Sequence, residues 1–565
     1  MKKLFLIIII LNIITLTDAQ NKINSFNLIT SKPLEYEKTE FNIKISATFN
    51  NPYVSSDIEL DMHLIAPSGK EIFLPCFYSS GDSISSIWKA RFAAQEIGIY
   101  TYYFNLLKPP HESINSDTST FTVAPSNKNG FLHVNGLWTL KFDSGKLFRG
   151  IGEDVAWESR SFDNPKWSYN YFLPKLSRDS ANFFRTWMCS WNLPLEWQRV
   201  HSTKRYHNTK KYYNPGGIKR LDQLVTMTDS LGLYFMLTLD NGGSLWNKFW
   251  FDSTYKRRNP KNPTHFFTYT SIQQKYKDKL RYIIARWGYS TSIAAFEFFN
   301  EIDNSAYTRS PQDSVIISQE AITEWHSEMS RYLHDIDPYH HIITTSISHR
   351  DIMGLDILPY IDINQKHIYK RTEQLRPEIL RYTKAYNKPY VIGEFGYEWD
   401  WNKDFSKITK GLLYDYKRGL WYGLFSPTPI LPMSWWWEYF DKHNMTTYFK
   451  GVREISDKML AAGHGSFKIV NTDAKVIEAY GLKCGEELFV YLLNNSNSTQ
   501  TSDVILHLKN NITYNVKGFI PVSRRYIDLS TTEKAADGIE VQGIKLKSKQ
   551  ELILELIPKI AQTQK

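Results

Sequence analysis

Hydrophobic and polar residues alternate with a period of two near both ends of the chain. Residues 41–45 show this pattern in the first part of the sequence, and residues 552–556 show it in the last part. Short alternating stretches that are separated by turn residues predict strands packed into a β-sandwich. We therefore expect an immunoglobulin-like β-sandwich over residues 20–127 and a second β-sandwich over residues 464–565.

The middle of the chain, residues 128–463, alternates between apolar runs and segments with helical periodicity. The apolar runs are candidate strands, at residues 147–151, 182–187, 233–239, 293–299, 341–346, 361–368, 389–395 and 431–437. Eight strands with interposed helices predict an α/β fold, the (β/α)8 TIM barrel. A doubly wound open sheet is the alternative, but Gly150-Ile151-Gly152 lacks the third glycine of a dinucleotide-binding turn.

Residues 1–19 have the pattern of a secretory signal peptide. Lys2 and Lys3 precede an apolar stretch, and the small residue Ala19 ends it. The stretch is shorter than the roughly 20 apolar residues that cross a bilayer, and no cysteine follows it to carry a lipid anchor. We expect a cleaved signal peptide and a secreted or periplasmic protein without a transmembrane segment.

Composition narrows the classes of function. The chain has 68 Lys and Arg residues and 58 Asp and Glu residues, so its formal net charge is +10. The basic residues are scattered along the sequence, which argues against nucleic-acid binding. The three cysteines lie far apart, so neither a disulfide framework nor a zinc knuckle is expected, and no other metal-ligand spacing is found. Aromatic residues make up 15% of the chain, and their flat faces suit ring-shaped ligands as well as cores.

Two predicted barrel strands end in a carboxylate. The fourth ends in Phe299-Asn300-Glu301, and the seventh ends in Gly393-Glu394. Catalytic groups of such barrels lie at the carboxyl ends of the strands, and an unpaired charge there is costly unless it has a purpose. Two glutamates that meet across a small substrate are what glycoside hydrolysis requires.

With these pairs in a barrel of this length, the chain resembles the clan A glycoside hydrolases, and especially the cellulases and mannanases of family five. Further positions match that family one by one. Arg185 resembles the arginine that supports the nucleophile, and His367-Ile368-Tyr369 is similar to the His-x-Tyr pair beside it. Trp435-Trp436-Trp437 ends the eighth predicted strand, where the family places a tryptophan under the reacting sugar.

The resemblance implies a retaining glycosidase that works by double displacement without metal or organic cofactor. Glu394 would be the nucleophile, Glu301 the acid/base, and Asn300 would bind the sugar 2-hydroxyl. The expected substrate is a polysaccharide, with β-glucan or mannan first. An exo-acting β-glycosidase on oligosaccharides and a non-catalytic carbohydrate-binding barrel remain alternatives.

Several residues have a second interpretation. Glu297 lies in mid-strand and is better explained by an ion pair inside the barrel, with Arg185 as the candidate partner. His367 could be a core histidine, and only Trp435 or Trp437, which share a face, is expected to reach sugar. The chain also departs from the family at two places. It has Gly152-Glu153-Asp154 where related barrels often carry Asn after the first strand, and Asp240-Asn241 where many have His beyond the third, which leaves the sugar unassigned.

Overall fold

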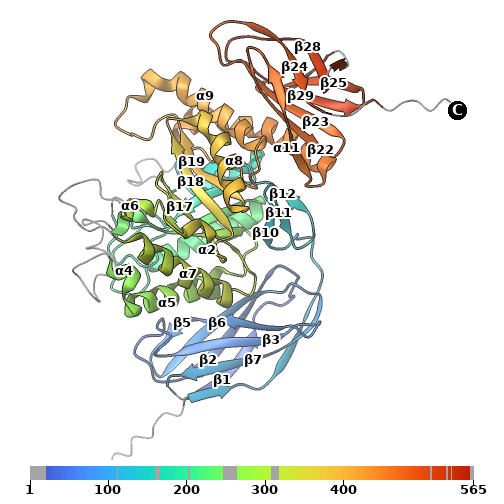
Figure 1. The fold of residues 1–565 in the computed structure, drawn as a ribbon. Coiled ribbons are helices and arrows are strands. Elements are labelled where there is room, and N and C mark those ends of the chain that lie inside the picture. The colour runs from blue at the N-terminus through green and yellow to red at the C-terminus, as the bar shows by residue number, and fades with distance from the viewer. Residues whose placement is uncertain are drawn as a thin grey trace, which may run out of the picture.

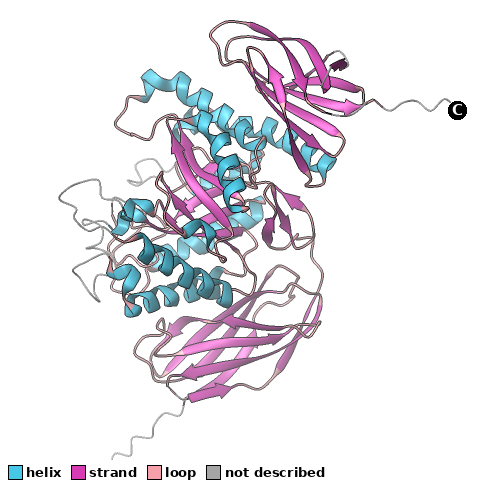
Figure 2. Cartoon of the chain, in the orientation of Figure 1, coloured by secondary structure: helices cyan, strands magenta, loops and turns pink. Residues whose placement is uncertain are grey.

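The computed structural model describes residues 21–110, 112–158, 166–201, 204–245, 264–306, 317–508, 512–529, 532–535 and 538–559. The expected signal peptide lies outside the described residues. The chain forms three parts in sequence order along an elongated molecule, with strand-rich parts at both ends and a mixed part between them (Figures 1 and 2). No helix among the described residues is long and apolar enough to cross a membrane.

The first part is a sandwich of two antiparallel sheets. One sheet has the order β1-β2-β6-β5, and the other has the order β4-β3-β7-β8 with β9 pairing to β7. Alternate side chains such as Phe41, Trp88 and Phe104 fill the space between the sheets. The strands are β1 Lys22–Leu28, β2 Lys38–Ser46, β3 Glu59–Ile65, β4 Glu71–Pro75, β5 Phe77–Gly81, β6 Ser85–Ala93, β7 Gly98–Lys108, β8 Glu112–Asn115 and β9 Ser119–Val123.

A small three-stranded sheet follows the sandwich, with the strands β10 Leu132–Asn135, β11 Thr139–Phe142 and β12 Leu147–Phe148. Its side chains Leu132, Phe142 and Phe148 join an apolar cluster with residues of the barrel strands. The predicted first barrel strand, residues 147–151, is therefore corrected. Its first two residues form β12, and its end enters the barrel, where Gly150 pairs with Ile430. The regular strand is β13, Gly152–Asp154, which is short and carries two acidic residues, so no apolar run reveals it.

The middle part is built on a parallel sheet with its strands in sequence order, β13 to β19. These strands are β13 Gly152–Asp154, β14 Phe183–Trp187, β15 Tyr234–Asn241, β16 Ile293–Asn300, β17 Ile342–Ile347, β18 Ile363–Tyr369 and β19 Tyr390–Gly396. Parallel strands in this order, each followed by helical crossovers, form the predicted barrel.

The barrel is closed by residues 430–435 rather than by a regular eighth strand. The Met433 amide donates to the Ile392 carbonyl and the Trp435 amide to the Phe395 carbonyl. On the other side, the Leu431 amide donates to the Gly150 carbonyl. The predicted strand 431–437 is therefore corrected: Pro432 has no N–H to donate, and a helix begins at Trp437.

Helices surround the barrel. The α-helices are α1 Tyr169–Arg178, α2 Pro215–Leu231, α4 His265–Thr268, α5 Thr270–Trp287, α6 Asp303–Ala306, α7 Gln319–Ile336, α8 Leu375–Tyr386, α9 Phe405–Leu424, α10 Trp437–Lys442 and α11 Phe449–Gly463. The 3-10 helices are η1 Gly242–Leu245, η3 Leu355–Ile357, η4 Thr372–Gln374 and η5 Met445–Tyr448.

The last part is a second antiparallel sandwich, with sheets β20-β22-β23-β29-β25-β26 and β21-β24-β28-β27. Leu488, Leu506 and Leu554 belong to its buried core. Its strands are β20 Phe467–Val470, β21 Thr472–Ala474, β22 Glu478–Cys484, β23 Glu487–Leu493, β24 Gln500–Leu506, β25 Tyr514–Ile520, β26 Arg525–Asp528, β27 Glu533–Ala535, β28 Gly538–Leu546 and β29 Glu551–Pro558.

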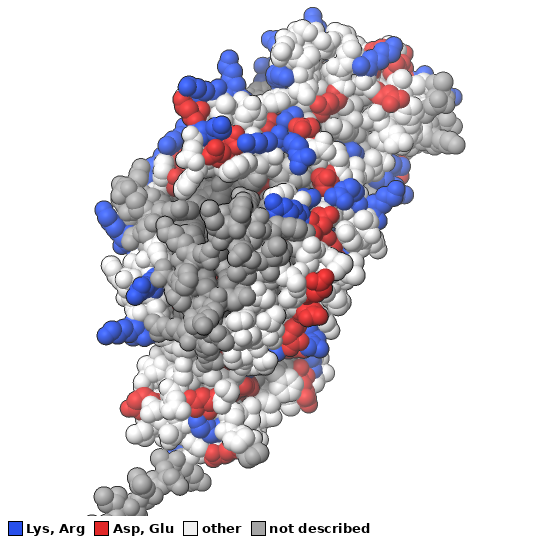
Figure 3. Space-filling model, turned by 60° about the vertical axis from the view of Figure 1, so that its left-hand side comes forward, with Lys and Arg blue, Asp and Glu red and all other residues white. Residues whose placement is uncertain are grey.

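Both sandwiches are attached to the outside of the barrel by polar contacts. Arg91 of β6 lies 3.1 Å from Asp222 of α2, and the Tyr422 hydroxyl of α9 donates to Glu478 of β22 at 2.7 Å. Lys and Arg side chains are interspersed with Asp and Glu on the face in Figure 3, without a continuous basic stripe. The flanking domains thus contact helices on the outside of the barrel.

Candidate active site

The carboxyl ends of four barrel strands bring the predicted polar residues together. Arg185 belongs to β14, Glu301 directly follows β16, His367 belongs to β18 and Glu394 to β19. His367 and Glu394 are partners in the register of β18 and β19. Gly393 leaves room for the side chains of β18, because a Cβ at that position would come 2.7 Å from Nε2 of Gln365 and 3.0 Å from Nε2 of His367.

The Glu394 side chain is almost fully buried, and both of its carboxylate oxygens accept hydrogen bonds. Arg185 Nη1 donates to Oε1 at 2.8 Å, and the Tyr369 hydroxyl donates to Oε2 at 2.6 Å. Only 4% of the side chain is exposed. Burial raises the pKa of Glu394 and nearby Glu301 adds to that effect, whereas His367 and Arg185 oppose it. The two donors fix the orientation of the carboxylate.

Arg185 also binds the barrel interior. Its Nε and Nη2 atoms donate to the two oxygens of Glu297 at 2.6 and 2.8 Å, which is the ion pair expected for Glu297. Although burial opposes it, the charge and hydrogen bonds of Arg185 hold the pKa of Glu297 below its usual value. Nη2 further donates to Oδ1 of Asn300 at 2.8 Å, so the arginine orients the predicted sugar-binding amide as well.

Asp154 is a third carboxyl group on this guanidinium. Its Oδ1 accepts from Arg185 Nη1 at 3.2 Å, and the side chain is fully buried. Burial, together with the charges of Glu394 and Glu297, raises the pKa of Asp154 well above its usual value, although Arg185 opposes the shift. A single guanidinium thus faces three buried carboxyl groups, and burial disfavours the charged form of Asp154.

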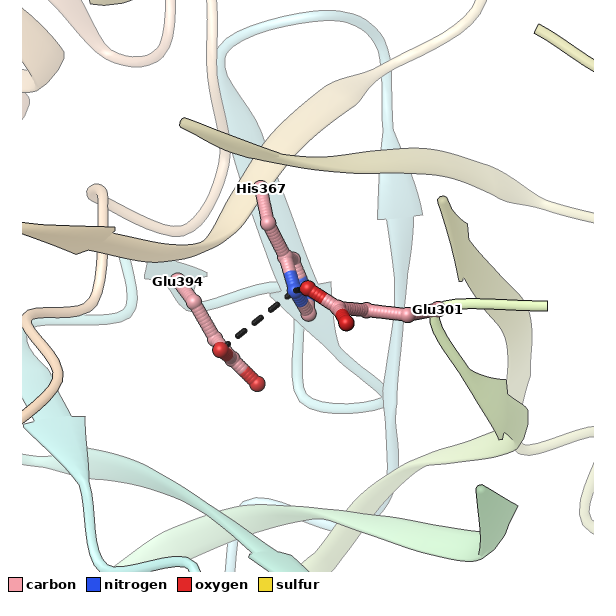
Figure 4. A group of neighbouring side chains, drawn as sticks. All are labelled: Glu301, His367 and Glu394. Carbon is pink, nitrogen blue, oxygen red and sulfur yellow. Dashed lines mark hydrogen bonds and ion pairs between the residues drawn. The ribbon is translucent and has the colours of Figure 1, made fainter. Parts of the chain in front are cut away.

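Glu301 lies in more open surroundings, opposite Glu394. Figure 4 shows both glutamates pointing toward His367 between them. His367 Nδ1 lies 3.1 Å from Oε1 of Glu301 and 3.4 Å from Oε2 of Glu394. Asn304 Nδ2 donates to the other Glu301 oxygen at 2.8 Å, and 25% of the Glu301 side chain is exposed.

The backbone at Glu301 is left-handed, with φ of 51°. This conformation costs a residue other than glycine about 1 kcal/mol. The Glu301 amide donates to Oγ of Ser346 at 3.0 Å, which holds the turn. The turn aims the carboxyl group into the barrel mouth instead of continuing the strand.

Glu301, His367 and Glu394 also form a possible metal-ligand set, because their donor atoms all lie within 4.8 Å of one another. Two carboxylates and an imidazole are suitable ligands for a divalent cation. The sequence predicted no metal site, and the same atoms are the ones expected to carry out acid-base chemistry.

A cavity of about 870 Å³ opens above these residues. Trp187 and Trp435 line it, together with Trp399, whose side chain is 55% exposed. Trp437 is buried and lies outside the lining, so of the two predicted tryptophans it is Trp435 that faces the cavity. Trp157 packs against both, with ring centroids 5.4 Å from Trp435 and 5.1 Å from Trp437.

The two departures from the resembled family have structural partners. Asp240 pairs with Lys279 of α5 at 2.7 Å, and burial raises its pKa to about 7. Glu153, next to Asp154, accepts from the Tyr416 hydroxyl at 3.2 Å, and burial raises its pKa to about 8. Neither Asp240 nor Glu153 lines the cavity.

The structure adds lining residues that the sequence did not single out. Most belong to the loops after β17 and β18, among them Arg350 and Arg371, and Lys366 lies within β18. Single charged residues in loops have no periodic pattern, so only the fold brings them to one wall.

Comparison with known proteins gives a family match within the first sandwich. Residues 33–106 match the family described as Domain of unknown function (DUF5060). A 128-residue stretch is 24% identical to mannan endo-1,4-beta-mannosidase F of Aspergillus fumigatus. That stretch covers 23% of this chain and 26% of the mannosidase, so the chain matches only about a quarter of that protein's length.

Solved structures of glycoside hydrolases share the fold. A candidate glycoside hydrolase from Bacteroides vulgatus superposes with a TM-score of 0.66 at 14% identity, covering 94% of this chain and 100% of the other. A second structure, named glycoside hydrolase, gives a TM-score of 0.50 at 15% identity over 76% of this chain and 97% of its own. The Bacteroides vulgatus structure therefore shares the fold of this chain over most of its length.

Proposed function

We propose that this protein is a retaining glycoside hydrolase that cleaves β-glycosidic bonds in a polysaccharide. The observation that carries the proposal is the pair Glu301 and Glu394, which approach within 4.8 Å on either side of His367 at the barrel mouth. Retaining enzymes have their two carboxyl groups about 5–5.5 Å apart, whereas inverting enzymes leave room for a water molecule between them at about 6.5–9.5 Å.

The contacts of each glutamate support one role in double displacement. Glu394, oriented by Arg185 and Tyr369, attacks the anomeric carbon, and the bond to the departing oxygen breaks as Glu301 protonates that oxygen. Glu301 then takes a proton from water, and the water oxygen displaces Glu394 from the anomeric carbon. Asn300, held by Arg185, donates its amide hydrogens to the sugar 2-hydroxyl oxygen.

The cavity supports an endo-acting enzyme. Trp399 belongs to the cavity lining, and Trp401 beside it is 70% exposed. Exposed indoles next to a cleft form stacking surfaces for further sugar rings. The partial similarity to a mannan endo-1,4-beta-mannosidase makes β-1,4-mannan the first substrate to try, with β-1,4-glucan second.

The test is reducing-sugar release by the wild type and Glu394→Gln from mannans, glucans, xylans and galactans. We expect a ladder of fragments from at least one polymer with the wild type and none with the variant. Proton NMR of the first products should show the β-anomer before mutarotation. Initial release of the α-anomer would contradict retention. Binding of a polymer without any cleavage would favour the non-catalytic carbohydrate-binding barrel.

Export of the protein is part of the proposal and rests on the signal-like pattern that ends at Ala19. Mass spectrometry of the protein recovered from the periplasm or medium of an expression host should give Gln20 as the first residue. An intact Met1 terminus inside the cells would contradict it.

A further inference from the structure

One wall of the cavity is built from cationic side chains. Arg350, Lys366 and Arg371 line it, near His349. Arg350 and Arg371 lie in the loops after β17 and β18, and Lys366 lies within β18. These two strands stand between β16, which Glu301 follows, and β19, which carries Glu394. Trp187 and Trp435 come from the opposite arc of the barrel, namely β14 and the closing segment. The cavity therefore has an aromatic side and a cationic side.

The positive charge of this wall is only partly balanced. Glu378 is the acidic lining residue apart from the two central glutamates. It accepts from Arg381 at 2.8 Å and lies 3.7 Å from Lys366. The Lys366 ammonium also lies 3.8 Å from Asp351, so it has no carboxylate among the described residues at hydrogen-bond distance.

Arg371 is the most available of the three cations. Its side chain is exposed, and it has no ion pair among the residues that the structure describes. Its neighbour Lys370 differs, because Lys370 pairs with Glu398 at 2.9 Å. A guanidinium with free donors can bind a carboxylate or a sulfate through two parallel hydrogen bonds.

The wall is also built to hold its position. Asp303, which is fully buried, accepts from the Ser348 amide at 2.6 Å and from the Arg350 amide at 3.2 Å. Asp303 follows Glu301 by two residues, so one turn of chain fixes both the proposed acid and the loop beside it. The leaving group that Glu301 protonates in the proposed mechanism therefore lies next to this loop.

From this arrangement, the geometry points to a substrate whose leaving-group sugar carries an anionic substituent, a uronic-acid carboxylate or a sulfate ester. This inference rests on the proposed function and names the substrate class of that same site. Arg371 and Lys366 bind the anion, while Trp435 faces the sugar on the other side of the scissile bond. Neutral sugars give such a wall no counter-charge, and cations that share a cleft repel one another unless an anion enters.

The test separates binding from cleavage by using Glu394→Gln as a background without turnover. Affinity gel electrophoresis compares three derivatives of one β-1,4-glucan: hydroxyethyl, carboxymethyl and sulfated cellulose. A second pair compares neutral xylan with glucuronoxylan. We expect at least one anionic polymer to bind about tenfold more tightly than its neutral counterpart, and the preference to weaken as salt rises.

In the same background, Arg371→Gln should lower affinity for the anionic polymer about tenfold, and adding Lys366→Gln should lower it further. Arg371→Lys should restore part of it. Arg178→Gln is the matched control, because Arg178 is an exposed arginine at the end of α1 outside the cavity; it should change nothing. Thermal unfolding of each variant should show that it is folded.

The polymer preferences identify the anionic group of the substrate or show that none is bound. Preference for carboxymethyl cellulose or glucuronoxylan assigns a carboxylate, and preference for sulfated cellulose assigns a sulfate ester. Equal binding of neutral and anionic polymers, or no effect of Arg371→Gln, would overturn the inference while leaving the proposed hydrolysis intact. If the wild type binds the anionic polymer through Arg371 but cleaves no polymer, the proposed function fails and the anion site stands.

Discussion

Two glutamates at the same barrel mouth have opposite surroundings. Glu394 is nearly inaccessible, with 4% of its side chain exposed, and both its oxygens accept short hydrogen bonds. Glu301 is 25% exposed and is held from a left-handed turn after its strand. The residue types are identical, so the difference between the two positions comes from the neighbours that each strand end provides.

This difference fits two chemical tasks. A nucleophile needs a fixed direction and no competing water, which the Arg185 and Tyr369 contacts give. An acid/base group needs room for a leaving group and then for water, which the cavity beside Glu301 gives. In the proposed mechanism, the environment therefore divides the roles, as it does in enzymes whose two carboxyl groups differ in pKa.

Removal of the buried carboxylate, that of Glu394, should have the largest effect on activity. Glu394→Gln keeps the shape but cannot form the glycosyl ester, so kcat should fall on the order of 10⁵-fold or more. The loss should be the same for polysaccharides and for activated aryl glycosides, because bond formation to the sugar fails in both. Steady-state kinetics on both substrate types measures this. A loss confined to polysaccharides would reverse the proposed roles.

Removal of the exposed carboxylate should depend on the leaving group. Glu301→Ala should slow polysaccharide cleavage by about 10²–10⁴-fold, but should leave the first step on a dinitrophenyl glycoside fast. Azide, which needs no proton removal, should then restore turnover and give a β-glycosyl azide, identifiable by NMR. Glu394→Gln is the control that azide should not rescue in this way. An α-azide product from Glu301→Ala would contradict the assignment.

The sequence predicted the positions of the two glutamates better than it predicted the first strand and the closing segment of the barrel. Glu301 and Glu394 follow long apolar runs, so their place at strand ends was readable. Strand β13 was missed because its three residues, Gly152–Asp154, include two carboxylates that are stabilised only by partners distant in sequence. The closing segment was predicted as a strand through Trp437, but Pro432 interrupts its ladder and Trp436 has φ of 67°.

The charged groups that surround the two glutamates could not be predicted from the sequence, because their partners are distant along the chain. Arg185 was predicted to support Glu394 or to pair with Glu297, and it does both. The third carboxyl group on it, Asp154, and the cationic wall at Arg350 and Arg371 each require segments far apart in sequence to meet. Patterns along one chain show which face a residue occupies, not which charge it meets there.

The buried pair beneath the nucleophile should matter for stability. Glu297→Gln removes the partner of two Arg185 nitrogens in a dry interior, and should lower the free energy of unfolding of the barrel by about 3 kcal/mol at pH 7. Denaturation followed by tryptophan fluorescence measures it. Glu328→Gln, which breaks the part-exposed pair with Lys277, is the control and should cost less than about 1 kcal/mol.

The sign of the pH dependence sharpens this prediction. The pKa of Glu297 is lower in the folded protein, so its contribution is present above the ordinary glutamate pKa. It is lost as pH falls through the folded value. The difference between Glu297→Gln and the wild type should therefore shrink in acid. A difference that is constant with pH would show that Glu297 stabilises through packing rather than charge.

Glu153 should show a pH dependence of the opposite sign. Burial raises its pKa from 4.5 to about 8, so between these values the folded protein binds a proton that the unfolded chain has released. Stability from this group is complete below about pH 4.5 and falls by about 1.4 kcal/mol per pH unit toward pH 8. Glu153→Gln removes this slope, so the variant should gain on the wild type as pH rises. Parallel denaturation profiles at pH 5, 6.5 and 8 would contradict this prediction and show that Glu153 is ionised in the folded barrel, beside the Tyr416 hydroxyl at 3.2 Å.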